Sequence, residues 1–215
     1  MDPALFVRLN TTVAAPPLVP EIRLHLATEV TPIWQASEDS LARGGVPPPF
    51  WAFAWAGGQA LARYLLDRPE TVAGRVGFDF GSGSGLVAIA AAKAGARSVY
   101  AAEIDHFAAT AIAANAALND VVVEIMATDA IGAADPRWQV VTAGDVCYER
   151  DMAHRVIPWL RALAGGGCPV LLGDPGRAYL PNDGLRKLAS YTVPTSRELE
   201  DSDTRDGVVW QVLPP

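Results

Sequence analysis

Apolar and polar positions follow two different periods along the chain from residue 76 onward. Short apolar runs of strand length, partly β-branched, are followed by longer Ala-rich or amphipathic runs of helical length. The pattern predicts strands at residues 76–80, 98–103, 121–126, 139–144 and 169–173, with helices between them at residues 85–95, 106–118 and 151–164. Such alternation is typical of an α/β fold around a mostly parallel sheet.

The two ends of the chain add a strand pair and a leader. The runs LASYTVP and GVVWQVL, joined by the polar TSRELEDSDTRDG, predict an antiparallel pair at one edge of the sheet. Apolar residues at helical spacing in WAGGQALARYLLDRP predict a helix that ends near Pro69. Residues 1–50, with their proline-rich stretches, are expected to form an N-terminal extension that packs on the core, and residues 51–215 to form the main domain.

Composition restricts the classes of partner. A chain of 215 residues, half of them hydrophobic, is long enough for one domain with a sizeable core. No apolar run reaches the roughly 18 residues of a membrane span, and the N-terminus lacks a signal-peptide pattern. The net charge of −7 argues against nucleic-acid binding, and the cysteines Cys147 and Cys168 have no metal-type spacing. We therefore expect a monomeric, cytoplasmic protein with no metal, nucleic-acid or membrane partner.

A glycine-rich turn follows the first predicted strand. In VGFDFGSGSGLVAIA, Asp79 precedes three alternating glycines, Gly81, Gly83 and Gly85, where the strand passes into a helix. Because glycines have no side chains, a nucleotide-type ligand can approach the main chain closely here. One interpretation is a nicotinamide dinucleotide, because Gly83 to Ala88 match G-x-G-x-x-(G/A) and Glu103 follows at about the required 20 residues.

The pattern Asp79-x-Gly81-x-Gly83-x-Gly85 resembles motif I of the seven-strand S-adenosylmethionine methyltransferases, which implies a different ligand. The acid before the glycines favours S-adenosylmethionine over a dinucleotide. A dinucleotide carries a pyrophosphate, which prefers helix N–H donors and little negative charge nearby. S-adenosylmethionine has no phosphate and carries a sulfonium and an ammonium, so Asp79 is favourable beside it. The Tyr-x-x-x-Lys motif of short-chain dehydrogenases is also missing before Lys93 and Lys187.

Two further acids are candidates for the rest of this cofactor. Glu103, at the end of the second strand, is placed to accept hydrogen bonds from both ribose hydroxyls. Asp105 is the alternative acceptor, although a helix cap suits it better. Asp129, after the third strand, is placed to meet the adenine amino group, and a solvated loop residue is the competing interpretation.

Three segments resemble a known family: PPPFWAFAWAGGQALARYLLD, DFGSGSG with AAEID, and GDVCYERDMAHRVIPWL. They resemble the lysine methyltransferases that modify the β-subunit of electron-transfer flavoprotein and, more distantly, the bacterial ribosomal-protein methyltransferases. The resemblance implies a Rossmann-like, seven-strand class I methyltransferase fold. It implies a protein-lysine N-methyltransferase that uses S-adenosylmethionine and has electron-transfer flavoprotein β-subunit as its protein substrate. One departure is Glu103, where an Asp is common.

The resemblance also implies roles for two more groups of residues. Asp145 and Tyr148 match the (Asp/Glu)-x-x-(Tyr/Phe) motif of these enzymes, which assigns them to the lysine pocket; the competing interpretation is a helix-capping acid and a packing ring. A lid over the methionine end of the cofactor is implied for Trp55, Gly57, Gly58 and Gln59. A small-molecule N-methyltransferase on the same fold and a non-catalytic nucleotide-binding protein remain as alternatives.

Overall fold

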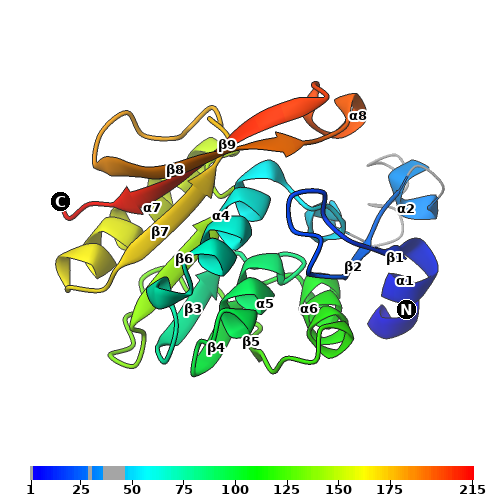
Figure 1. The fold of residues 1–215 in the computed structure, drawn as a ribbon, viewed down its shortest axis with the longest axis horizontal. Coiled ribbons are helices and arrows are strands. Elements are labelled where there is room, and N and C mark those ends of the chain that lie inside the picture. Colours follow the sequence, from blue (N-terminus) through cyan, green and yellow to red (C-terminus); the bar gives the residue numbers. More distant parts are fainter. Residues whose placement is uncertain (1, 29–30, 36–46) are drawn as a thin grey trace.

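The computed structural model describes residues 2–28, 31–35 and 47–215. Seven strands form one sheet in the order β5-β4-β3-β6-β7-β9-β8 (Figure 1). The strands are β3 (Val76–Phe80), β4 (Ser98–Ala102), β5 (Glu124–Met126), β6 (Val140–Gly144), β7 (Val170–Asp174), β8 (Leu185–Pro194) and β9 (Thr204–Val212). The first five pair in parallel, and β9 pairs antiparallel with both β7 and β8 at one edge. The predicted fold class is confirmed.

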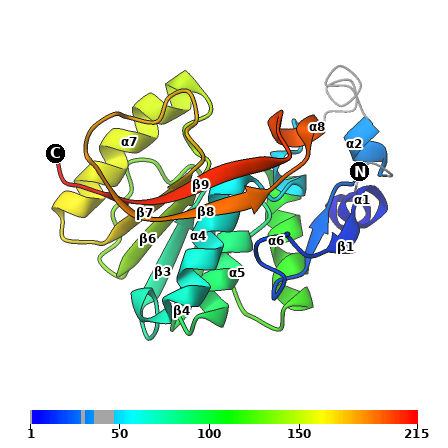
Figure 2. The same ribbon diagram turned by 45° about the horizontal axis from the view of Figure 1, so that its top comes forward.

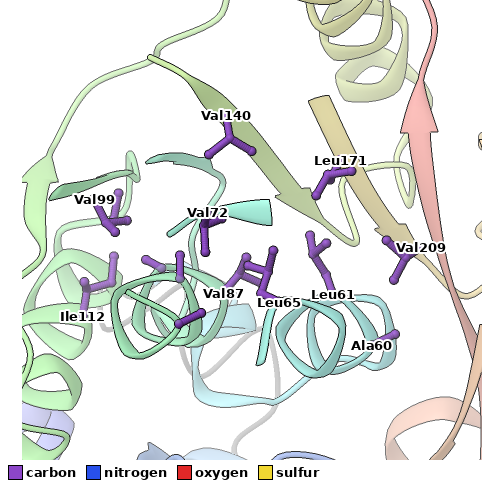
Figure 3. Close-up of a cluster of buried hydrophobic side chains, with 14 of the residues drawn as sticks. Ala60, Leu61, Leu65, Val72, Val87, Val99, Ile112, Val140, Leu171 and Val209 are labelled. Atoms are coloured by element: carbon purple, nitrogen blue, oxygen red, sulfur yellow. The ribbon is translucent and has the colours of Figure 1, made fainter. Parts of the chain in front are cut away.

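Helices cover both faces of the sheet (Figure 2). On one face lie α4 (Ala56–Asp67) and α5 (Leu86–Lys93), and α6 (His106–Leu118) contributes Ile112 to the same core. Leu61, Leu65 and Val87 fill the space between these helices and the strands (Figure 3). On the other face α7 (Arg150–Gly165) packs over an aromatic core. Strand side chains point alternately to the two cores, as the period of two requires.

The N-terminal segment packs on α6. It contains α1 (Pro3–Asn10), the antiparallel strands β1 (Thr12–Ala14) and β2 (Leu24–Leu26), α2 (Pro32–Gln35) and η1 (Phe50–Ala52); η2 (Pro69–Thr71) follows α4. The rings of Phe6 and Phe107 lie 4.6 Å apart. The Asn115 side chain accepts from the His25 amide and donates to the Ser84 carbonyl, which links β2 to the glycine loop. A domain division at residue 50 stays a prediction.

Three expected strands differ from their predicted bounds by more than one residue. The predicted strand 121–126 begins only at Glu124, because Val121 still donates its amide to Ala116 at the end of α6. The C-terminal strands are longer than predicted, and their polar connection contains the short helix α8 (Arg197–Glu200). No helix in the ranges described above has both the length and the apolarity to cross a membrane.

Candidate functional site

A cavity of about 440 Å³ opens beside the carboxyl ends of β3, β4 and β6. Because β3 has β4 on one side and β6 on the other, this is the point where the strand order reverses, the usual ligand site of such sheets. The predicted residues along its wall are Trp55, Gly81, Gly83, Glu103, Asp129, Asp145 and Tyr148. A smaller adjoining hollow adds Gly58 and Asp79. Gly57, Gln59 and Gly85 line neither space.

The three glycines of the loop have different surroundings. All have left-handed backbones, with φ of 60° at Gly81, 53° at Gly83 and 81° at Gly85. Gly81 and Gly83 face the cavity. Gly85 instead caps α5, and a Cβ there would lie 3.2 Å from Ile112 of α6. The first two glycines leave main chain open to a ligand, whereas the third allows two helices to pack closely.

Asp79 is a buried acid at the end of β3. Its carboxylate accepts hydrogen bonds from Ser82 Oγ at 2.5 Å and from Thr142 Oγ1 at 2.7 Å. Burial raises its pKa to about 6, and the two hydroxyls offset part of that rise. A cation in the adjoining hollow would favour the ionised form.

Glu103 fastens the glycine loop to the end of β4. One carboxylate oxygen accepts from the Gly83 amide at 3.0 Å, and the other from the amides of Ile104 and Asp105. A carboxylate has about four acceptor positions, so capacity remains for a ligand hydroxyl. Asp105 caps α6 by accepting from the Phe107 amide at 2.8 Å, although it also borders the cavity. The helix-cap interpretation of Asp105 is confirmed.

Asp129 lies at the far end of the cavity. It accepts from the Ile131 amide at 3.0 Å and pairs with Arg155 of α7 at 2.7 Å. These contacts lower the pKa of its carboxyl, and the hydrogen bond from the Ile131 amide is the larger cause. The side chain is half-exposed, so it is a charged group at the cavity rim.

Asp145 follows β6 directly, with a left-handed backbone at φ of 54°. One carboxylate oxygen accepts from the Gly58 amide at 2.7 Å. The other accepts from Arg177 Nε at 3.0 Å and Nη2 at 2.8 Å. Burial raises the pKa of Asp145 to about 6 although Arg177 opposes the rise. Asp145 is thus a buried, cavity-lining acid that already has a cationic partner.

Aromatic rings surround the cavity mouth near Asp145. The rings of Phe50 and Tyr148 lie 5.4 Å apart, and those of Phe50 and Trp55 lie 6.3 Å apart. Tyr148 is 45% exposed, and burial of the remainder raises its pKa. Trp55 donates its indole N–H to the Phe50 carbonyl at 2.8 Å. An apolar mouth with a polar end group beside it suits an aliphatic chain that ends in an amine.

The other two residues of the predicted lid have internal contacts. A Cβ on Gly57 would lie 2.5 Å from the Gly173 carbonyl oxygen, so this glycine allows α4 to approach β7. Gln59 is buried; it accepts from the Leu18 amide and donates to the Ala54 carbonyl. Gln59 therefore connects α4 to the N-terminal segment, away from the cavity.

The donor set fits the S-adenosylmethionine predicted from the sequence. The cavity lies in the size range of small-molecule sites. Its two arginines, Arg155 and Arg177, are both paired with acids of the site. The acids that line the two spaces, Asp79, Glu103, Asp105, Asp129 and Asp145, outnumber them. An excess of carboxylates suits a ligand with a sulfonium and an ammonium.

Known proteins with similar sequences identify the family. The electron transfer flavoprotein beta subunit lysine methyltransferase of Xenopus laevis is 36% identical over 218 residues, which cover 99% of this chain and 87% of that protein. The Danio rerio protein of the same name is 38% identical over 200 residues, covering 90% of this chain and 76% of its own length. This chain belongs to the electron transfer flavoprotein beta subunit lysine methyltransferase family.

More distant comparisons agree with this family. A family model described as ribosomal protein L11 methyltransferase (PrmA) matches residues 60–144. The ribosomal protein L11 methylase of Lactobacillus delbrueckii superposes with a TM-score of 0.52 at 22% identity, covering 75% of this chain and 81% of that one. Magnesium protoporphyrin IX methyltransferase from Synechocystis, with bound SAM, has a TM-score of 0.53 at 19% identity, covering 72% and 77%. At such identities the likeness shows a shared methyltransferase fold.

Several residues of this family member's site have no signal in the sequence pattern. Ser82 and Thr142 hold Asp79, and Arg155 pairs with Asp129. Arg177 lies in the loop after β7, within LLGDPGRAYLP, a stretch that also looks like the flavoprotein-directed enzymes but from which the sequence predicts no site residue. Its partner Glu200 lies in the polar connection between β8 and β9 and is nevertheless buried.

Proposed function

We propose that this chain transfers methyl groups from S-adenosylmethionine to lysine side chains of the electron transfer flavoprotein beta subunit. The observation that carries the proposal is one cavity that contains the glycine loop and Glu103 together with Asp145 and Tyr148. In this proposal the cofactor and the lysine amine would occupy one space. The names of the family's members support the choice of protein substrate.

Each part of the cofactor has a candidate partner. Glu103 would accept from the ribose hydroxyls, and Gly81 and Gly83 would leave room for the adjacent main-chain contacts. Asp79 lies in the smaller hollow, where it would face the cationic methionine end. Asp129 would meet the adenine amino group. When bound, S-adenosylmethionine supplies an electrophilic methyl group on its sulfonium.

The lysine must be neutral before it can attack that methyl group. With a reference pKa of about 10.4, the ammonium loses its proton near pH 7.4 at a cost of about 4 kcal/mol. The aromatic mouth at Phe50, Trp55 and Tyr148 would remove water from the side chain, and desolvation lowers the cost. Asp145 would then orient the amine by a hydrogen bond and help pass its proton to water. The remaining catalytic contribution would come from holding the amine in line with the bond between the methyl group and the sulfur.

Net charge and the state of the cysteines support the proposed partner and cellular location. A net charge of −7 suits a lysine in a basic surface segment of the substrate protein. Cys147 and Cys168 are both free thiols, which agrees with the cytoplasmic location that we propose.

The test is incubation of the purified chain with S-adenosylmethionine and purified flavoprotein beta subunit, followed by peptide mass spectrometry. We expect methyl-lysine on the subunit. If methyl-lysine appears only on another protein of a cell lysate, the substrate assignment is wrong and the assignment of lysine methylation stands. Transfer to a small amine alone would make the chain a small-molecule enzyme. Cofactor binding without any transfer would make it a binding protein.

A further inference from the structure

Arg177 is held between two acids. Its Nε and Nη2 donate to Asp145 Oδ1 at 3.0 and 2.8 Å. Its Nη1 and Nη2 donate to the two carboxylate oxygens of Glu200 at 2.9 and 2.7 Å. The side chains of Arg177 and Glu200 are 15% and 1% exposed. Contacts from two sides fix the guanidinium plane, so Arg177 keeps one position beside Asp145.

The pair lines the cavity, whereas Glu200 lies behind it. Asp145 and Arg177 both border the space that contains Tyr148, and the guanidinium carbon lies 5.4 Å from the centre of the Trp55 ring. A lysine side chain that enters between the aromatic rings therefore meets Asp145 and Arg177 together. It does not meet an isolated carboxylate.

Other titratable groups pack against this pair from several elements. Asp174 at the end of β7 is buried and accepts from the Arg177 amide; burial raises its pKa. Arg205 of β9 lies 3.6 Å from Glu200. Cys147 and Tyr148, which follow Asp145, have raised pKa values, that of Cys147 to about 12. Two groups that do not titrate complete the surroundings: the ring of Trp55, the residue before α4, and the amide of Gly58 in its first turn. Between about pH 7 and 9.5 the raised pKa values of Cys147 and Tyr148 keep both side chains neutral, and Asp145, with a pKa of about 6, is mostly ionised. An amine bound there is therefore the group whose charge changes.

The charge balance decides which form of the lysine the site prefers. An unpaired carboxylate would stabilise the ammonium, which cannot attack a methyl group. A carboxylate whose charge is offset by a guanidinium stabilises that ammonium less than an unpaired one does, and the guanidinium itself repels the ammonium. A neutral amine can still donate a hydrogen bond to Asp145.

We propose that Arg177 is a positioning residue that neutralises Asp145, so that the pocket admits the substrate lysine as its neutral amine. This inference rests on the proposed function and deepens it. It assigns the selection between amine and ammonium to the Asp145–Arg177–Glu200 group, three side chains from the end of β6, the loop after β7 and α8.

The first test is the pH dependence of single-turnover methylation of the flavoprotein beta subunit, at saturating concentrations. The variant Arg177→Gln with Glu200→Gln removes one positive and one negative charge. Asp145 loses its cationic partner, and Glu200 is not left as a buried, unpaired carboxylate. We expect its rate to rise at a pH about 1 unit or more above that of the wild type, with a roughly tenfold deficit near pH 7.5 that closes towards pH 9.5. Glu200→Gln alone leaves Arg177 less neutralised and should move the rise to lower pH. Arg197→Gln, which removes an exposed arginine of α8, is the matched control and should keep the wild-type profile.

The second test measures binding without turnover. Two peptides are compared by calorimetry in the presence of the demethylated cofactor: one with trimethyl-lysine, a fixed cation, at the methylated position, and one with norleucine there. The double variant should raise the ratio of cation to neutral affinity about tenfold. Unchanged pH profiles or an unchanged ratio in folded variants would overturn the inference and leave lysine methylation intact. If the wild type does not methylate lysine, both the proposed function and the proposed role of Arg177 are wrong.

Discussion

The amide of Gly58 donates a hydrogen bond of 2.7 Å to Oδ2 of Asp145, 87 residues away in the sequence. Gly58 lies in the first turn of α4, and the N-cap residue Trp55 provides no side-chain cap. The carboxylate of Asp145 therefore caps α4, and its charge lies at the positive end of the helix dipole. Asp145 is both a helix-capping acid and a cavity-lining one, and the helix that it caps is not the one that follows it.

Adjacent glycines in this turn should respond differently to the same substitution. In Gly57→Ala the new Cβ would lie 2.5 Å from the Gly173 carbonyl oxygen and 2.6 Å from Asp145 Oδ2, both in the packed core of the site. We expect the free energy of unfolding to fall by about 2 kcal/mol. In Gly58→Ala the nearest atom is Asp145 Oδ2 at 3.9 Å, so stability should stay the same or rise by up to about 1 kcal/mol. Denaturant unfolding compares the two, and equal stabilities would contradict the close approach of α4 to β7.

Two neighbouring acids should separate cofactor binding from stability. Glu103→Ala should weaken S-adenosylmethionine binding by about 2–3 kcal/mol, because the charge-assisted hydrogen bonds to the ribose and the contact that fastens Gly83 of the glycine loop are both lost. Asp105→Ala removes the cap of α6 and should cost about 1 kcal/mol of stability, with cofactor affinity within about twofold of the wild type. Calorimetry and thermal unfolding on the same preparations test this. The reverse pattern would assign the ribose to Asp105.

Cofactor affinity should depend on pH through Asp79. Its pKa, raised to about 6 by burial, makes it partly protonated in the free protein at mildly acidic pH. A cationic methionine end favours the carboxylate, so binding lowers this pKa and affinity rises as protons leave. From about pH 5 to pH 7 the affinity should rise roughly tenfold. Asp79→Asn should give a flat profile, and Asp145→Asn should keep the slope. A slope that survives Asp79→Asn would place the titrating group elsewhere.

The sequence predicts those parts of the molecule that have a local pattern. Helix 106–118 matches α6 residue for residue, and the strand at 76–80 matches β3. Both have an apolar period together with a clear boundary, Asp105 at the start of the helix and the glycines after the strand. The residues Glu103, Asp129 and Asp145 meet at one cavity because parallel strands end at the same edge of the sheet.

What the sequence does not predict depends on contacts between distant segments. Arg177 lies 32 residues from Asp145 and 23 from Glu200, and no periodicity links them. Glu200 belongs to the polar connection between the last two strands, for which the sequence predicts no buried residue, yet its ion pairs with Arg177 and Arg205 stabilise it in a buried position. Gln59 lies among residues implied for a lid, but its helical position turns it towards Leu18. The positions of these three side chains are set by contacts between segments that are distant in the sequence.

The most direct test of the central claim is single-turnover methyl transfer to lysine by Asp145→Ala. Substitution removes the acceptor that orients the amine, so the rate should fall by about 10²–10⁴. The cofactor affinity should stay within about twofold, since we propose that Asp145 holds the amine and that Asp79 faces the cofactor. Because Asp145 also caps α4, unfolding temperature and cofactor affinity are measured on the same preparation, and the rate is expressed per folded, cofactor-bound molecule. Asp145→Asn, which keeps a carbonyl acceptor, should retain more activity than Asp145→Ala if orientation is enough. A wild-type rate in folded, cofactor-bound Asp145→Ala would contradict the assignment of the lysine site.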